Sequence, residues 1–265
     1  MFNMIYGDIY KMFKSSAVKI LFTITALSSV IMAVLGHLIA EGRINGSFGG
    51  IAFLFADINV VSILGGVMAG VFICGDFENK TIHEAIASGS SRGKVVISKA
   101  VVFLCGIVLL LLPYALVTGI AAGVGSTFST GKASLGFLYL LTEESGAVLK
   151  GGDAAKLIAV MAVLIIVIAA QLSVCIPLAF SLKKPVLVIG IYYAISILSG
   201  QLLGLARNFK IFDKLYSFTP FGGKGMFMSL KMGAGDMGKP IAVSIFFIVL
   251  MLLVTYGIFR KAEIK

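Results

Sequence analysis

The sequence predicts an all-α polytopic membrane protein with six transmembrane helices. Hydrophobic residues make up 59% of the 265 residues, charged residues make up 13%, and the mean hydropathy is +1.06. Uncharged apolar runs of about 20 residues recur along the chain, and this is the length that an α-helix needs to cross the hydrocarbon core of a bilayer. These observations exclude a soluble globular protein.

Residues 1–17 precede the first apolar run and are predicted to form an amphipathic interfacial helix. Apolar residues recur there at helical spacing, whereas Asp8, Lys11 and Lys14 lie off the apolar stripe. The stripe consists of Phe2, Ile5, Ile9, Met12 and Phe13. We expect the lysines to face anionic lipid at the cytoplasmic surface; the alternative is a frayed N-terminus.

Residues 18–265 are predicted to form a single transmembrane domain. Window hydropathy places its spans at about 18–40, 51–74, 95–124, 157–182, 185–205 and 240–259. Only Lys183 and Lys184 separate the fourth span from the fifth, so these two are expected to form a tight helical hairpin. The first run begins too late and is too long for a signal peptide, and we interpret it as a retained helix.

The distribution of Lys and Arg sets the expected orientation. With both termini in the cytoplasm, basic residues crowd into short inner segments, whereas the outer ones are diluted over loops of about 30 residues. We therefore expect a multi-pass protein of the cell (plasma) membrane with both termini cytoplasmic. The net charge of +10 does not indicate nucleic-acid binding, because the basic residues lie at the ends of apolar runs, where anionic lipid or an acidic partner would meet them.

Residues 75–99 form the only long charged segment between two strongly apolar runs that also carries helix-start chemistry. Thr81 and Glu84 have the spacing of a capping box, in which the threonine oxygen accepts from the Glu84 N–H and the glutamate reaches back to the Thr81 N–H. A short helix should begin there. Its apolar stripe would consist of Ile82, Ala85 and Ile86.

Gly89 is expected to end this short helix, and Ser90 or Ser91 to cap a second helix that continues into the third span. The pattern therefore predicts a short helix, a break and a membrane helix that re-enters the bilayer. The alternative is an amphipathic cytoplasmic loop that lies on the membrane.

No catalytic or metal site can be assembled from the sequence. The run at 89–95 has one residue too few between its glycines for a Walker A loop, and Val95 stands where that loop needs a hydroxyl. His37 and His83 fall on opposite faces of the membrane in this topology, so they cannot share a metal or a catalytic triad. We expect that the chain is not an enzyme and binds no cofactor itself.

Polar residues within the spans are few. Asp57 and Asn59 are expected near the outer end of the second span, where water can reach them, and Gln171 lies nearer the middle of the fourth span. Gln171 is the best candidate for a hydrogen bond inside the bundle and is also a candidate for the substrate pathway. The apolar residues of the two long outer segments, at 135–141 and 209–228, either cap the bundle or gate substrate exit.

Three pairs of glycines have the G-x-x-x-G spacing that lets helix backbones approach closely. The pairs are Gly66 and Gly70, Gly119 and Gly123, and Gly200 and Gly204. Because the chain contains 31 glycines, these matches predict packed helices and nothing more specific.

The order of these elements, together with the motif at 76–99, whose Lys99 matches a lysine before the third span, resembles the permease subunits of ABC-2 type ABC transporters. The motif reads D-F-x-N-x-T-I, then six residues, then G-x-S-R. The permeases of Gram-positive bacteria that accompany multidrug, bacitracin or lantibiotic resistance are the most similar kind. That family usually has glycine at the position of Lys80 and often arginine at the position of His83.

The resemblance implies that the segment is a coupling helix, which docks in a groove of a separate ATP-binding subunit and transmits its closure to the spans. It also implies two copies of that subunit, which bind ATP and Mg²⁺, and a second permease chain of the same or a sister type. The implied contact residues are Phe77, Glu78, Thr81, Ile82, Glu84, Ile86 and Arg92. The expected function is export of an amphipathic antimicrobial peptide, drug or lipid-like molecule.

Two other functions fit the same topology. A non-transporting immunity or assembly subunit would use the same ATPase contact for another purpose. A stand-alone secondary carrier would need ionisable residues that line the midplane of the membrane, where the sequence places essentially only Gln171.

Overall fold

The computed structural model describes residues 2–130, 134–146, 151–206 and 209–262, and within these ranges the chain forms helices and no strand. Six helical runs within these ranges are long and apolar enough to cross a membrane. They are Ser16–Ala40, Gly46–Glu78, Arg92–Val124, Gly152–Leu182, Pro185–Gly204 and Gly235–Lys261. Each overlaps one predicted span over most of its length, so the predicted fold class is confirmed.

The second and fourth runs are each divided into shorter helices, and short helices also lie between the spans. In chain order the elements are α1 (Phe2–Lys14), α2 (Ser16–Ala40), η1 (Gly46–Phe48), α3 (Gly49–Leu54), α4 (Asp57–Ala69), η2 (Gly70–Cys74, one turn of π-helix), α5 (Gly75–Glu78), α6 (Thr81–Ala87), α7 (Arg92–Val124), α8 (Gly136–Glu143), α9 (Gly151–Leu172), α10 (Cys175–Leu182), α11 (Pro185–Ala206), α12 (Lys210–Tyr216), α13 (Gly223–Met226) and α14 (Ala234–Lys261).

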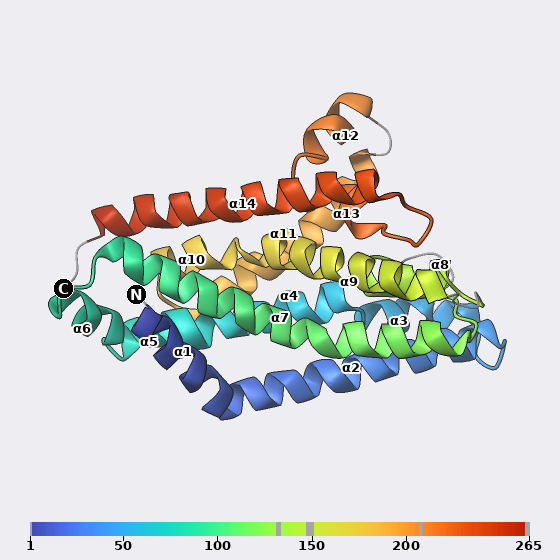
Figure 1. Ribbon diagram of the computed structural model, residues 1–265, viewed down its shortest axis with the longest axis horizontal. Helices are drawn as coiled ribbons and strands as arrows, with labels where there is room; N and C mark the ends of the chain where they lie inside the picture. Colours follow the sequence, from blue (N-terminus) through green and yellow to red (C-terminus); the bar gives the residue numbers. More distant parts are fainter. Residues whose placement is uncertain (1, 131–133, 147–150, 207–208, 263–265) are drawn as a thin grey trace.

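The spans run side by side along the long axis of the molecule (Figure 1). The N-terminus and the end of α14 lie at the same end, together with α1, α5 and α6, and we call this the terminal end. The opposite end, which carries α3, α8, α12 and α13, is the far end. Between them α2 packs on α7, α4 packs on α7 and α11, and α9 and α10 pack on α14.

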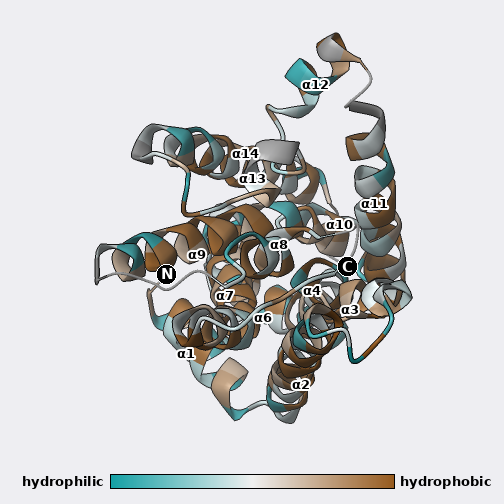
Figure 2. Cartoon of the chain, turned by 90° about the vertical axis from the view of Figure 1, so that its right-hand side faces the viewer, coloured by the Kyte–Doolittle hydropathy of each residue, from teal (hydrophilic) through white to brown (hydrophobic). Residues whose placement is uncertain are grey.

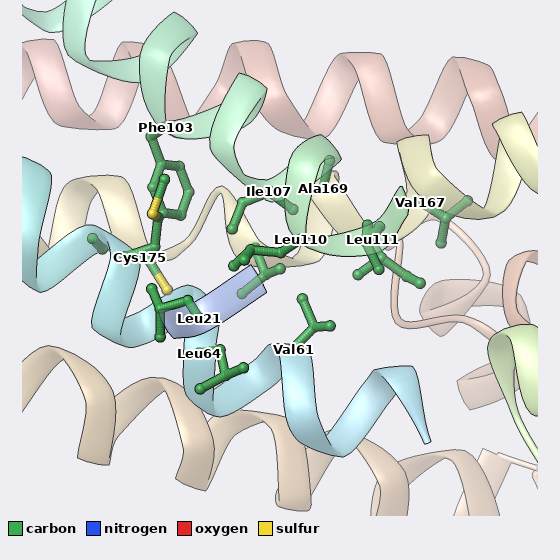
Figure 3. Packing of buried hydrophobic residues seen from close by; sticks show 14 of the residues in the cluster. Leu21, Val61, Leu64, Phe103, Ile107, Leu110, Leu111, Val167, Ala169 and Cys175 are labelled. Atoms are coloured by element: carbon green, nitrogen blue, oxygen red, sulfur yellow. The ribbon is translucent and has the colours of Figure 1, made fainter. Parts of the chain in front are cut away.

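The core of the bundle is formed where α2, α4, α7, α9 and α10 meet (Figure 3). Side chains such as Leu21, Val61 and Ile107 interdigitate there and are almost fully buried. Gly66 and Gly70 let α4 and η2 approach α11, because a Cβ at either position would press on Ile189 or Pro185. This confirms the close approach predicted for the first glycine pair.

The outer surface of the bundle is also apolar. Figure 2 shows hydrophobic residues on the outward faces of the spans as well as between them, and Val186, Ile120 and Phe246 are 78%, 67% and 67% exposed. In the most apolar 18-residue stretch of α11 only 11% is buried, and the same fraction holds for α14. Such a surface suits contact with lipid or with another membrane helix.

Helix α1 departs from the predicted amphipathic pattern because it has two apolar faces. Met12 is buried and Ile5 and Ile9 pack against the core, whereas an aromatic stripe faces outward. The stripe consists of Phe2, Tyr6, Tyr10 and Phe13. Phe2 and Phe13 were predicted to share one face with Ile5 and Met12, and the packing of α1 against α7 separates them.

Candidate functional site

The segment that carries the motif leaves the bundle at the terminal end (Figure 1). Lys80 joins α5 to α6 in the left-handed conformation, with φ = 57°. Glycine adopts this conformation without steric penalty. This is a physical reason why glycine is usual at the position of Lys80 in the family that the motif resembles. The turn folds α6 back, and the Thr81 hydroxyl stabilises it by donating a hydrogen bond to the Asp76 carbonyl over 3.0 Å.

The predicted capping box at Thr81 does not form. The helix does begin at Thr81, but Thr81 is its first helical residue, and Lys80 occupies the cap position without a side-chain hydrogen bond. The Thr81 hydroxyl, which was predicted to accept from the Glu84 N–H, donates to the Asp76 carbonyl in the preceding turn instead.

The predicted break after α6 is confirmed. Gly89 has φ = 91°, and its N–H donates to the Ile86 carbonyl while the Ser90 N–H donates to the Ala85 carbonyl. This left-handed termination satisfies carbonyl groups at the end of a helix. The Ser91 hydroxyl then accepts from the Lys94 N–H over 3.4 Å and caps α7, so Ser91 and not Ser90 performs the predicted capping.

The apolar stripe of α6 faces the chain itself. Ile82 is 1% exposed, and Ala85 and Ile86 pack against the core. Ile82 and Ala85 also line a cavity of about 250 Å³ between α6, α1 and α7. The expectation that the Ile82 side chain buries in a groove of a partner is therefore wrong for this conformation, because α1 and α7 already cover that face.

The opposite face of α5 and α6 is free for contact. Glu78, Thr81 and Glu84, all predicted contact residues, are exposed, as are Lys80 and Ser88. Two other predicted residues are turned inward: Phe77 is 7% exposed and Ile86 is half-buried. The surface that a partner could touch is thus polar and carries two carboxylates.

Asp76 holds this segment to the rest of the chain through a cluster of charged side chains, in which Asp76 and Lys99 are buried and Lys11 is half exposed. Asp76 is 1% exposed and accepts hydrogen bonds from Lys11 of α1 over 2.7 Å and from Lys99 of α7 over 2.5 Å. Lys99 also donates to Asp8 of α1 over 2.7 Å. We call these four residues the charged cluster. Lys11 was expected to face anionic lipid, and its ion pair with Asp76 corrects that expectation.

Phe77 ties the same segment to the ends of two further spans. Its ring meets Phe180 of α10 and Phe259 of α14 edge-on, with centroids 5.4 Å and 6.0 Å apart. The Lys183 ammonium lies 5.2 Å from the centre of the Phe77 ring, where it makes a cation–π contact. Adjacent residues 76 and 77 therefore join α5 to α1, α7, α10 and α14.

Arg92, another predicted contact residue, binds within the chain. Its guanidinium donates to the carbonyls of Phe259, Arg260 and Ala262 over 2.8, 2.7 and 2.9 Å. These carbonyls lie at the C-terminal end of α14, where backbone acceptors lack helical partners and the helix dipole favours a cation. Arg92 thus fixes the start of α7 to the end of α14.

Near the middle of the fourth span, Gln171 makes the predicted hydrogen bonds inside the bundle. Its side-chain N–H group donates to the Pro220 carbonyl over 2.9 Å and to the Met226 sulfur over 3.1 Å. Gln171 therefore holds the segment before α14 against α9. It also lines a cavity of about 280 Å³.

Asp57 is buried, which corrects the expectation that water reaches it. Its side chain is fully enclosed, and one carboxylate oxygen accepts from the Phe137 N–H over 3.2 Å. Gly136, with φ = 60°, lies so close that a Cβ there would overlap this carboxylate. Asp57 thus occupies the meeting point of the N-termini of α4 and α8, whose partial positive charges favour a carboxylate.

Within the described ranges, no group of three or more His, Cys, Asp or Glu side chains is arranged to hold a metal ion. Comparison with protein-family models, with curated proteins and with solved structures finds no match to this chain. The motif at 76–99 and the geometry around it therefore carry the functional argument.

Proposed function

We propose that this chain is the membrane-spanning permease subunit of an ABC-2 type transporter, which exports an amphipathic molecule with energy from a separate ATP-binding subunit. The observation that supports this proposal most is the construction of the α5–α6 segment. It exposes a polar face at the terminal end, and two consecutive residues, Asp76 and Phe77, connect it to four other helices.

This construction suits the transmission of movement from a partner to the spans. A partner that displaces α6 would pull on α1 and α7 through the charged cluster and on α10 and α14 through the Phe77 ring. Packed and ion-paired elements shift as units, because a close-packed interior does not deform continuously. The π-helical turn η2, directly before α5, is the type of irregularity that often accompanies a functional hinge.

The proposed assembly contains two ATP-binding subunits, which hold ATP and Mg²⁺, and a second permease chain of the same or a sister type. The terminal end would face the cytoplasm of the cell, where those subunits reside. The aromatic stripe of α1 would lie among lipid headgroups, a position that suits aromatic side chains. The exposed faces of α11 and α14 leave room for lipid or for the second permease.

The test is co-purification, from detergent, of the tagged chain with the ATP-binding subunit that is encoded nearest to its gene. Glu84→Lys reverses a charge on the exposed face of α6 without touching the core, and we expect it to reduce capture of that subunit at least about tenfold. Ile82→Asp is unsuitable as a test because Ile82 is buried within the chain, where a charge would disrupt its packing.

Asp213→Lys is the matched control, since it makes the same charge change at an exposed position of α12 at the far end. Capture should be unchanged in this variant. Equal capture by wild type and Glu84→Lys would count against the proposed contact. Failure of wild type to capture any ATPase would favour a stand-alone carrier.

A further inference from the structure

The cavity beside Gln171 is lined by residues of α4, α9 and α11 and by Phe53, Leu135, Phe221 and Met226. Its volume of about 280 Å³ lies just below the range of sites that enclose a drug-sized molecule. Ile197, Gly200 and Gln201 of α11 line it and are also exposed. The cavity therefore has its mouth on α11, the span whose outward face is largely uncovered.

The lining is uncharged and combines apolar side chains with a smaller set of polar ones. Asn59, Gln171 and Gln201 contribute amides and Ser196 and Ser199 contribute hydroxyls, and no Asp, Glu, Lys, Arg or His is among the described residues that line it. An ionised group would lose its hydration in such a cavity without gaining a counter-charge. The cavity thus selects against charged headgroups.

Two acceptors in the lining are available to a ligand. The Asn59 amide donates through its nitrogen to the Phe53 carbonyl over 2.7 Å, and the Gln171 amide donates through its nitrogen to Pro220 and Met226. Both side-chain oxygens accept no hydrogen bond from the part of the chain that the structure describes. A ligand with a hydroxyl group or an amide N–H would satisfy them.

We propose that this cavity binds the uncharged, hydrogen-bond-donating head of a membrane lipid, whose acyl chains remain outside along α11. The volume admits a glycerol-sized head but not a whole lipid. Ile197 at the mouth and Leu198 and Leu202 beside it are 48%, 60% and 37% exposed and offer an apolar path for acyl chains. This site lies beyond the proposed function, because binding would require neither ATP nor a partner.

The test uses three photoreactive lipids that carry a diazirine in the same acyl chain, with the purified chain alone in nanodiscs. The probes are a diacylglycerol, the matching phosphatidic acid and the methyl ether of the diacylglycerol. We expect saturable cross-linking of the diacylglycerol to residues 196–203 or 221–226, read by mass spectrometry. The methyl ether, which lacks the donor, should label about 2- to 10-fold less, and the charged phosphatidic acid should label less still.

Two glycine substitutions on α11 make the test specific. A Cβ at Gly200 or at Gly190 would meet no atom within 4 Å, but only Gly200 lines the cavity. Gly200→Phe should fill the cavity and abolish saturable labelling, whereas Gly190→Phe should label like wild type. Equal labelling of wild type and Gly200→Phe, or equal labelling by all three probes, would mean ordinary lipid contact and would overturn the proposal.

Discussion

Asp57 and Asp76 are both buried, and they lie near opposite ends of the same helical run. At the terminal end, Asp76 is bound by two lysine side chains from two other helices. At the far end, Asp57 has no cation among its described partners and is held by the backbone N–H of Phe137 at the start of α8. The same buried side-chain type is thus stabilised by full charges at one end and by helix N-termini at the other.

This difference indicates which end of the bundle keeps its helices together when a partner displaces one of them. A buried ion pair is directional and binds separate helices, and removal of one partner leaves an uncompensated charge in a low-dielectric interior. A helix N-terminus supplies only about half an elementary charge and acts within one helical turn. The terminal end is therefore expected to move as one unit, whereas the far end can rearrange around its cap.

The largest expected effect is that of Lys99→Met, which removes the ammonium shared by Asp8 and Asp76. Two carboxylates would then remain with only Lys11 nearby, and we expect a loss of about 3–5 kcal/mol in the free energy of unfolding. The measurement is titration with SDS of the detergent-purified protein, followed by circular dichroism.

Lys14→Met is the matched control for Lys99→Met. Lys14 lies on α1 as an exposed residue over the Tyr10 ring, so its loss should change the free energy of unfolding by less than about 1 kcal/mol. Similar losses for the two variants would show that the charged cluster does not stabilise the terminal end more than a surface lysine does.

A smaller effect is expected from Asp57→Ala, which removes the acceptor for the Phe137 N–H and leaves that group buried. Loss of a helix cap destabilises a protein by about 0.5–2 kcal/mol. Asp57→Asn keeps an acceptor oxygen and should recover most of this loss in the same SDS titration. If Asp57→Asn were as unstable as Asp57→Ala, the negative charge and not the cap would be what matters, and the contrast with Asp76 would disappear.

The fold could be predicted from the sequence because the bilayer imposes one strong requirement on every span. A long apolar run must be a helix in lipid, so hydropathy alone gave all six spans and the hairpin at Lys183. The breaks inside the spans, at 55–56 and 173–174, escaped prediction because an apolar residue can lie in a helix or beside a break without changing the window average.

The sequence located the candidate site but did not predict which of its side chains face the rest of the chain and which face outward. The stop at Gly89 and a serine cap at 90 or 91 were predicted correctly, because Gly89 and Ser91 each act on backbone groups within a few residues of themselves. Ile82 was misjudged because its neighbours, α1 and α7, are brought there by tertiary packing. Thr81 was misjudged because the left-handed turn at Lys80 places the Asp76 carbonyl within reach of its hydroxyl. A signal for the charged cluster did exist: Asp8, Asp76 and Lys99 are charges at the edges of apolar segments, where burial demands a partner.

The smallest expected effect on the free energy of unfolding concerns two lysines in the left-handed conformation, of which only one also makes a side-chain contact. Lys80 and Lys183 both have φ near +55°, at 57° and 54°, a conformation that non-glycine residues adopt at a steric penalty of about 1–2 kcal/mol. Lys80→Gly removes this penalty but increases the freedom of the unfolded chain, which offsets about 0.5–1 kcal/mol. The net result should be a gain of up to about 1 kcal/mol.

Lys183→Gly provides the comparison, because Lys183 also lies over the Phe77 ring and its side chain would be lost. A cation–π contact contributes about 0.5–1 kcal/mol, enough to cancel the backbone gain. The SDS titration should therefore rank Lys80→Gly above wild type and Lys183→Gly level with it or below. The reverse order would mean that Lys80 has an interaction that its exposed position does not reveal, and that the turn before α6 is stabilised by more than its backbone.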